Sequence, residues 1–181
     1  MFYYGDLYNS NIYNRQNAVS YALNYAMKPN PSYRYFASHG DGGGDCSNFV
    51  SQCLRAGGAP FAYDSSPWWY KKHIINRNND VWSLSWAVAH SLYWTLKTRD
   101  KSNVKGLKAV EIQDISELEI GDLIQYENEK GTIYHSVIIT GFTYDKGERI
   151  PLISQHSFDA RNTTYIKAKA KKMHFMKVVI S

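Results

Sequence analysis

The sequence predicts an α+β domain in which helices from the first half of the chain pack on an antiparallel sheet formed by the second half. Apolar residues recur with helical spacing up to about residue 98, and from residue 119 onward the spacing approaches two, as in strands. Helices that precede strands in this way are typical of α+β domains. With 181 residues and no visible linker, residues 1–181 are expected to form one domain.

The first predicted helix follows Asn14, a side chain suited to cap a helix N-terminus, and ends before Pro29 and Pro31. Small and aromatic residues recur on one face of this helix. That face consists of Ala18, Tyr21, Ala22, Tyr25 and Ala26.

A second helix is expected from about Asp45 to Ala56, ended by Gly57 and Gly58. Residues 59–70 are interpreted as irregular, and a third helix is expected over residues 80–98. Its buried side is predicted to contain Trp82, Trp86, Val88, Ala89 and Tyr93. Strands are expected at 123–126 and 135–142, with a return strand within 150–158 and one or two strands within 163–180.

Composition limits the classes of partner. The net charge of +5 is mild and favours at most an anionic partner such as a bacterial wall polymer. No nucleic-acid-binding motif is visible, and no stretch approaches the ~20 apolar residues of a membrane span, so neither nucleic acid nor membrane insertion is expected. The first 14 residues lack the pattern of a signal peptide. We therefore expect either a cytosolic protein or a piece of a longer chain.

Cys46 is the candidate nucleophile. It lies in the stretch DGGGDCSNFVSQC, residues 41–53, where a glycine-rich loop meets the second helix. Unpaired N–H groups and the helix dipole in the first turn favour a thiolate and can hold an oxyanion. Cys53 lies two turns later, ~10 Å away, so no disulfide is expected. Cys53 is interpreted as a buried apolar residue, which is also the alternative for Cys46.

A nucleophilic cysteine needs a base, and His135 is the best placed of the six histidines because it opens the most apolar strand just after a turn. If Phe142 pairs with Arg149 in the following hairpin, His156 falls opposite this base and can orient it. A register one residue different brings Gln155 or Ser157 there instead.

A second chemistry is open to the same residues. Cys46, His135 and His156 could bind zinc, with water as a fourth ligand. No HExxH or CxxC pattern accompanies them, so the thiol mechanism is preferred and neither a metal nor a cofactor is expected.

Six segments between about Tyr13 and Asn162 combine into a recognisable pattern: YNRQNAVSYALNYAMKPNPSYRYF, GGDCSNFVSQCLRAGGAPF, WWY, GDLIQY, HSVIITG and SQHSFDARN. This pattern resembles the putative amidase domain, a branch of the NlpC/P60 superfamily of papain-like cysteine hydrolases. The resemblance implies a papain-like fold. The chain departs from the superfamily pattern at Asn48, where glycine is usual, and in a helical insert at about residues 64–103, which matches this branch.

The resemblance also implies residue roles. Cys46 is the expected nucleophile, His135 the base and His156 the orienting residue. Asp45 and Ser47 are candidates for positioning the substrate amine.

Aromatic residues complete the expected substrate site. Tyr35 or Phe36 corresponds to an aromatic residue that often lines the pocket in this superfamily. Trp68, Trp69 and Tyr70 either wall the cleft or pack the insert onto the domain.

The superfamily resemblance implies that amide bonds in peptidoglycan are the substrate. The expected activity is that of an N-acetylmuramoyl-L-alanine amidase or a peptide endopeptidase at the bacterial cell wall. The protein would be a secreted fragment of a longer chain, or a phage endolysin without a signal peptide. The alternatives are a wall-binding module without catalysis and a zinc hydrolase.

Overall fold

The computed structural model describes residues 13–38 and 43–181. Residues 1–12 and 39–42, which include part of the glycine-rich loop, lie outside this description. The helices are α1 (Arg15–Tyr25), α2 (Cys46–Ala56), α3 (Leu84–Ala87) and α4 (Ala89–Lys101), with 3₁₀ turns η1 (Arg77–Asn79) and η2 (Ile115–Glu117). No helix among the described residues is long and apolar enough to cross a bilayer.

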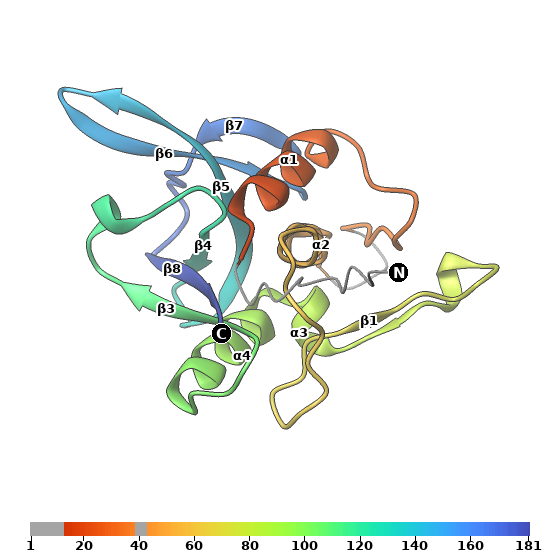
Figure 1. Ribbon diagram of the computed structural model, residues 1–181. Helices are drawn as coiled ribbons and strands as arrows, with labels where there is room; N and C mark the ends of the chain where they lie inside the picture. The colour runs from red at the N-terminus through yellow and green to blue at the C-terminus, as the bar shows by residue number, and fades with distance from the viewer. Residues whose placement is uncertain (1–12, 39–42) are drawn as a thin grey trace, which may run out of the picture.

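A six-stranded antiparallel sheet forms the second half of the chain. Its strands are β3 (Leu107–Ile112), β4 (Leu123–Glu127), β5 (Ile133–Asp145), β6 (Glu148–Gln155), β7 (Ala160–Thr164) and β8 (Lys172–Ile180). They lie in the order β3-β8-β4-β5-β6-β7. Figure 1 shows the N-terminal helices beside this sheet, as an α+β fold requires. The predicted fold class is confirmed at this level.

The two faces of the sheet have separate apolar cores. On the helical face, Leu123 and Ile138 pack with residues of α1, α2 and α4. On the opposite face, Ile124, Val137 and Ile153 pack under the segments that contain η2 and Tyr165. The alternation along β4 and β5 therefore decides which side chains meet the helices.

The first two helices agree with the sequence prediction. The Asn14 side chain accepts a hydrogen bond from the Asn17 N–H at 2.9 Å and caps α1. Ala18, Ala22 and Ala26 are fully buried, whereas the two tyrosines of the stripe are partly buried against the same core. Helix α2 ends at Ala56, directly before the glycine pair.

The third predicted helix was wrong in its first half. Val81 and Trp82 form the short strand β2 (Val81–Trp82), which pairs with β1 (Tyr70–Lys71). The extended backbone of Val88 then separates α3 from α4. The insert is thus a β-hairpin followed by two helices, and Figure 1 shows the β1 hairpin extending away from the body. Strand β3 was not predicted.

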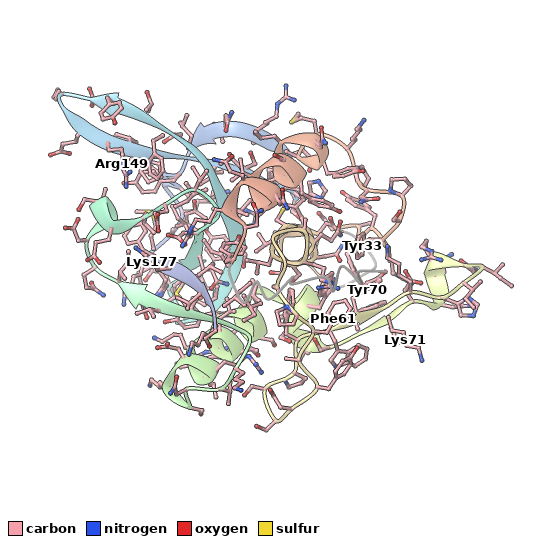
Figure 2. All side chains as sticks on the ribbon, viewed as in Figure 1. Tyr33, Phe61, Tyr70, Lys71, Arg149 and Lys177 are labelled. Atoms are coloured by element: carbon pink, nitrogen blue, oxygen red, sulfur yellow. The ribbon has the colours of Figure 1, made fainter. Side chains whose placement is uncertain are left out.

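Aromatic side chains attach the insert to the helical core. Figure 2 shows Tyr33, Phe61 and Tyr70 near α2, on the side of the β1 hairpin. The rings of Tyr33 and Tyr70 are 5.1 Å apart, and buried Trp86 lies 5.1 Å from Tyr70. The Trp86 indole N–H donates to Asn48 Oδ1 at 2.7 Å, which ties the insert to α2.

Candidate active site

Cys46 is the first residue of α2 and lies against strand β5. Its Sγ is 3.8 Å from Ser47 Oγ, and the Ser47 hydroxyl donates to Ser136 Oγ at 3.2 Å. The pairing of β5 with β6 extends only as far as Ile138, so the edge of β5 at His135 and Ser136 is left for the start of α2. The structure therefore brings the predicted nucleophile to the strand that carries the predicted base.

The resting state of Cys46 differs from the expected thiolate. The side chain is 4% exposed, and this burial raises the pKa of the thiol. Hydrogen bonds from the Ser136 backbone and from Ser47 lower that pKa but do not outweigh burial. Cys46 is therefore a neutral thiol at neutral pH, and it needs a base to become a nucleophile.

Cys53 is fully buried on the same helix, in the core shared by α1 and α2. Both cysteines are free, as predicted. Burial raises the pKa of Cys53 well above its usual value, so this thiol is an apolar core residue.

His135 is held as a neutral imidazole. Its Nε2 lies 3.0 Å from Gln155 Oε1, and its ring lies 5.8 Å from the ring of Tyr126. Burial and the nearby charge of Lys167 lower the pKa of His135 to about 4, against a smaller opposing effect of the Gln155 hydrogen bond. A neutral imidazole can act as a general base toward a thiol that comes within hydrogen-bond reach.

Gln155 contacts His135, and the predicted contact of His156 with His135 was wrong. The hairpin pairs Phe142 with Pro151 and Tyr144 with Arg149, with an irregularity between Ile139 and Gly141. This register differs from the predicted pairing of Phe142 with Arg149. Gln155 is one of the two alternatives, with Ser157, that the sequence leaves open for this contact.

His156, which follows β6, instead contacts the start of α2 and the end of α1. Its Nδ1 lies 2.5 Å from Asp45 Oδ2, and its Nε2 lies 2.7 Å from the carbonyl oxygen of Tyr25. Its ring stacks on Phe49 at 4.2 Å. Because both neighbours accept hydrogen bonds, both ring nitrogens must donate. Burial alone would lower the pKa of His156, but the bonds to Asp45 and Tyr25 and the charge of Asp45 raise it overall.

The carboxylate of Asp45 is buried and forms hydrogen bonds with other residues of the protein. It is 1% exposed, and besides His156 it accepts hydrogen bonds from the Phe36 backbone at 2.9 Å and from Asn48 Nδ2 at 2.8 Å. The predicted contact of Asp45 with a substrate amine does not fit this burial. Ser47 is likewise fully buried, and its hydroxyl faces Ser136 and Cys46.

Two adjoining hollows lie over the candidate site. The larger, of about 400 Å³, is lined by residues that include Ser38, Tyr134, His135, Ser157, Phe158 and Lys167. The smaller, of about 110 Å³, is lined by Cys46 together with parts of the α3–α4 junction. Gly43 and Tyr134 line both. A substrate that spans the two hollows would pass over both Cys46 and His135.

Gly44 permits the close approach of two loops beside Cys46. Its φ is +95°, and a Cβ at this position would lie 2.3 Å from Ser157 Oγ. The Ser157 hydroxyl also accepts a hydrogen bond from the Asp45 N–H at 2.7 Å. Glycine is therefore required at position 44, directly before the N-cap residue Asp45.

The predicted aromatic residues have different positions. Tyr35 is 43% exposed, and its ring lies edge-on 6.2 Å from His156. Trp68 is fully buried and donates to Ser51 Oγ at 3.1 Å, and Trp69 stacks on Tyr63 at 6.0 Å. Neither tryptophan is among the described residues that line the two hollows. Their contacts indicate that both tryptophans pack the insert onto the domain. The prediction that Trp68 and Trp69 line the substrate cleft was therefore wrong.

Cys46, His135 and His156 are not arranged so that all three could bind one metal ion. Both ring nitrogens of His156 face Asp45 and Tyr25, away from any shared ligand position with His135. Within residues 13–38 and 43–181, no three His, Cys, Asp or Glu side chains are arranged to hold a metal.

One residue of the site was missed from the sequence. Lys167, in the segment between β7 and β8, donates from Nζ to Gln155 Oε1 at 2.7 Å. It lies in a run of alternating lysines and alanines, which carries no signal for a catalytic position. Only the tertiary path of this segment brings one of these lysines to Gln155, beside His135.

Comparisons with known proteins place the chain in a family. Residues 12–179 match the family model described as "Putative amidase domain". The chain is 39% identical over 154 residues to "Uncharacterized protein YhbB" of Bacillus subtilis (strain 168), covering 82% of this chain and 43% of that protein. It is 31% identical over 137 residues to "Uncharacterized protein YjcM" of the same organism, covering 71% and 28%. The chain thus spans less than half the length of these curated relatives. No solved structure gives a significant match.

Proposed function

Given that this chain belongs to the putative amidase domain family, we propose that it is a cysteine-dependent hydrolase with a papain-like fold that cleaves amide bonds in bacterial peptidoglycan. The observation that carries the proposal is the placement of Cys46 at the start of α2, against the strand that holds His135. A buried thiol and a neutral imidazole at two adjoining hollows would serve as the nucleophile and base of acyl transfer.

The proposed reaction begins when His135 takes the proton of the Cys46 thiol as sulfur attacks the carbonyl carbon of the amide. The tetrahedral oxyanion receives a hydrogen bond from the Cys46 backbone N–H, one of the unpaired donors at the start of α2. The C–N bond then breaks, and the leaving amine takes the proton from His135.

Hydrolysis of the thioester completes the cycle. A water molecule attacks the acyl carbon while His135 accepts its proton, and the carbon–sulfur bond breaks to release the acid. The proton returns to Cys46. Gln155, through its contact with His135 Nε2, orients the base during both halves of the reaction.

Peptidoglycan is the proposed substrate because the sequence resembles superfamily members that act on it and because both curated relatives come from a Gram-positive bacterium. The bond cleaved would be either the muramoyl–alanine amide or an amide within the wall peptide. The proposed place of action is the cell wall.

The test is a digest of purified Gram-positive peptidoglycan by the wild type and by Cys46→Ala, with released fragments identified by mass spectrometry. We expect fragments from the wild type and a loss of at least ~10⁴-fold in their rate of release by the variant. The masses of the fragments identify the bond. Folded wild-type protein that releases nothing from several wall types would contradict the proposal, and retention on those walls would then favour a binding module.

A further inference from the structure

The side-chain amide of Gln155 is held at both of its ends. Its Oε1 lies 3.0 Å from His135 Nε2 and 2.7 Å from Lys167 Nζ, and its Nε2 lies 2.6 Å from the carbonyl oxygen of Phe158. Three partners from three segments of the chain therefore converge on one buried amide, which is 4% exposed.

Two of these partners define which end of the amide is oxygen. An ammonium group has only donors, so Lys167 must face the oxygen of Gln155. A carbonyl group has only acceptors, so Phe158 must face the NH₂ group. The alternative orientation would place an NH₂ group against an ammonium and an oxygen against a carbonyl oxygen.

The orientation of Gln155 in turn defines the tautomer of His135. Because the amide oxygen accepts at Nε2, this nitrogen carries the proton. In the neutral ring the other nitrogen, Nδ1, is then the unprotonated base. Had the amide turned over, its NH₂ group would favour the tautomer with the proton on Nδ1, which cannot accept a proton from a thiol.

We propose that Lys167 is a positioning residue of the hydrolase: its ammonium group locks the Gln155 amide and thereby keeps Nδ1 of His135 available as the base. This inference rests on the proposed function, because it assigns His135 that role. It adds a residue from the segment between β7 and β8 to a site otherwise built from α2, β5 and β6.

The surroundings of Lys167 fit this role. The side chain is half-buried, its Nζ lies 5.2 Å from the centre of the Tyr126 ring, and it lines the same hollow as His135. The carbonyl of Phe158 is aimed at Gln155 by a turn in which Ser157 and Phe158 both have positive φ, at 59° and 96°. Backbone strain of this kind persists where the surrounding structure requires it.

The test compares the loss caused by Lys167→Met in two backgrounds. Glutamate at position 155 has two equivalent oxygens, so turning it over changes neither its contact with His135 nor its contact with the Phe158 carbonyl, and no lock is needed. We expect Lys167→Met to lower the plateau kcat ~10-fold when residue 155 is Gln, a fraction of what a general base contributes. In a Gln155→Glu background the same change should alter the plateau kcat by less than ~2-fold. The rates are compared at the plateau of each pH profile, because removing a cation also shifts the titration of His135.

Matched variants separate the lock from general effects. Lys167→Arg retains a donor-only cation and should keep most of the activity. Lys171→Met removes a lysine from the same segment, where it is 53% exposed and paired with Glu129, and should leave activity unchanged. Equal losses from Lys167→Met in both backgrounds would overturn the proposal.

A second measurement does not depend on activity. Nitrogen-15 NMR of the His135 ring reports the tautomer directly. We expect the Nε2–H form in the wild type, a mixture in Lys167→Met, and the Nε2–H form again in the double variant Gln155→Glu/Lys167→Met. An unchanged tautomer in folded Lys167→Met would refute the inference, and a changed tautomer would support it. Both results hold even if the protein proves to have a substrate other than peptidoglycan.

Discussion

The two cysteines share one helix face but have different surroundings. Cys46 lines a hollow next to the strand of His135, whereas Cys53 is enclosed by the core of α1 and α2. The loop-to-helix pattern of the sequence was sufficient to assign these positions. It was insufficient for the pKa of Cys46, because the favourable effect of the helix terminus was visible in the sequence and the opposing burial was not.

Variants of the two cysteines should therefore separate activity from stability. Cys46→Ala should abolish hydrolysis and leave the fold intact. Cys53→Ala should retain much of the activity and lower the free energy of unfolding by ~1–2 kcal/mol, as small core truncations do. Urea unfolding and initial rates measure both effects. Similar losses of activity in the two folded variants would show that the roles are assigned wrongly.

At the scale of elements, two consecutive residues at the end of β6 contact different parts of the site. Gln155 contacts the base, and the next residue, His156, binds Asp45 at the start of α2 and the carbonyl of Tyr25 at the end of α1. Which of the two would meet the base depended on a hairpin register. The sequence pattern could not determine it, since an irregularity between Ile139 and Gly141 shifts the pairing.

The Asp45–His156 pair should make stability depend on pH. The pKa of His156 is raised in the folded protein, so its contribution is fully present below the unfolded value of about 6.5 and is lost as pH rises through the folded value. His156→Ala leaves a buried carboxylate without its partner and should cost about 3–5 kcal/mol below pH ~6.5, the cost typical of breaking a buried ion pair.

Urea unfolding at several pH values between about 6 and 9 measures this effect. The difference in the free energy of unfolding between wild type and His156→Ala should shrink as pH rises. Asp45→Asn breaks the same pair from the other side, so adding His156→Ala to it should produce a difference that varies much less with pH. A wild-type advantage that stays constant or grows toward alkaline pH would contradict the buried imidazolium.

At the scale of the whole molecule, the order of elements was predictable and the long-range pairing was not. Periodicity identified α1, α2 and the strands β4, β5, β6 and β8, because each forms from a local pattern. Strand β3 was not predicted, because it is defined by its pairing with β8, about 70 residues later. The hairpin of β1 and β2 was not predicted, because Trp82 also fits helical spacing. In the structure Trp82 is in a strand and its ring stacks on that of Tyr70.

The same limit applies to the candidate site. Residues supplied by one local motif, such as Cys46, were found in the sequence. Lys167 was not found, since its position depends on how the segment between β7 and β8 crosses the sheet. The family match covers residues 12–179, so the described site lies within the family domain, while the matched parts make up 43% and 28% of the two curated relatives.

The most direct test of the account is the mass of the intact protein during turnover of a peptidoglycan fragment. We expect an added acyl group that peptide mapping places on Cys46, that hydroxylamine removes, and that forms regardless of chelator. Hydrolysis that proceeds without any adduct, persists in Cys46→Ala and stops with chelator would contradict it and would indicate attack by a metal-bound water.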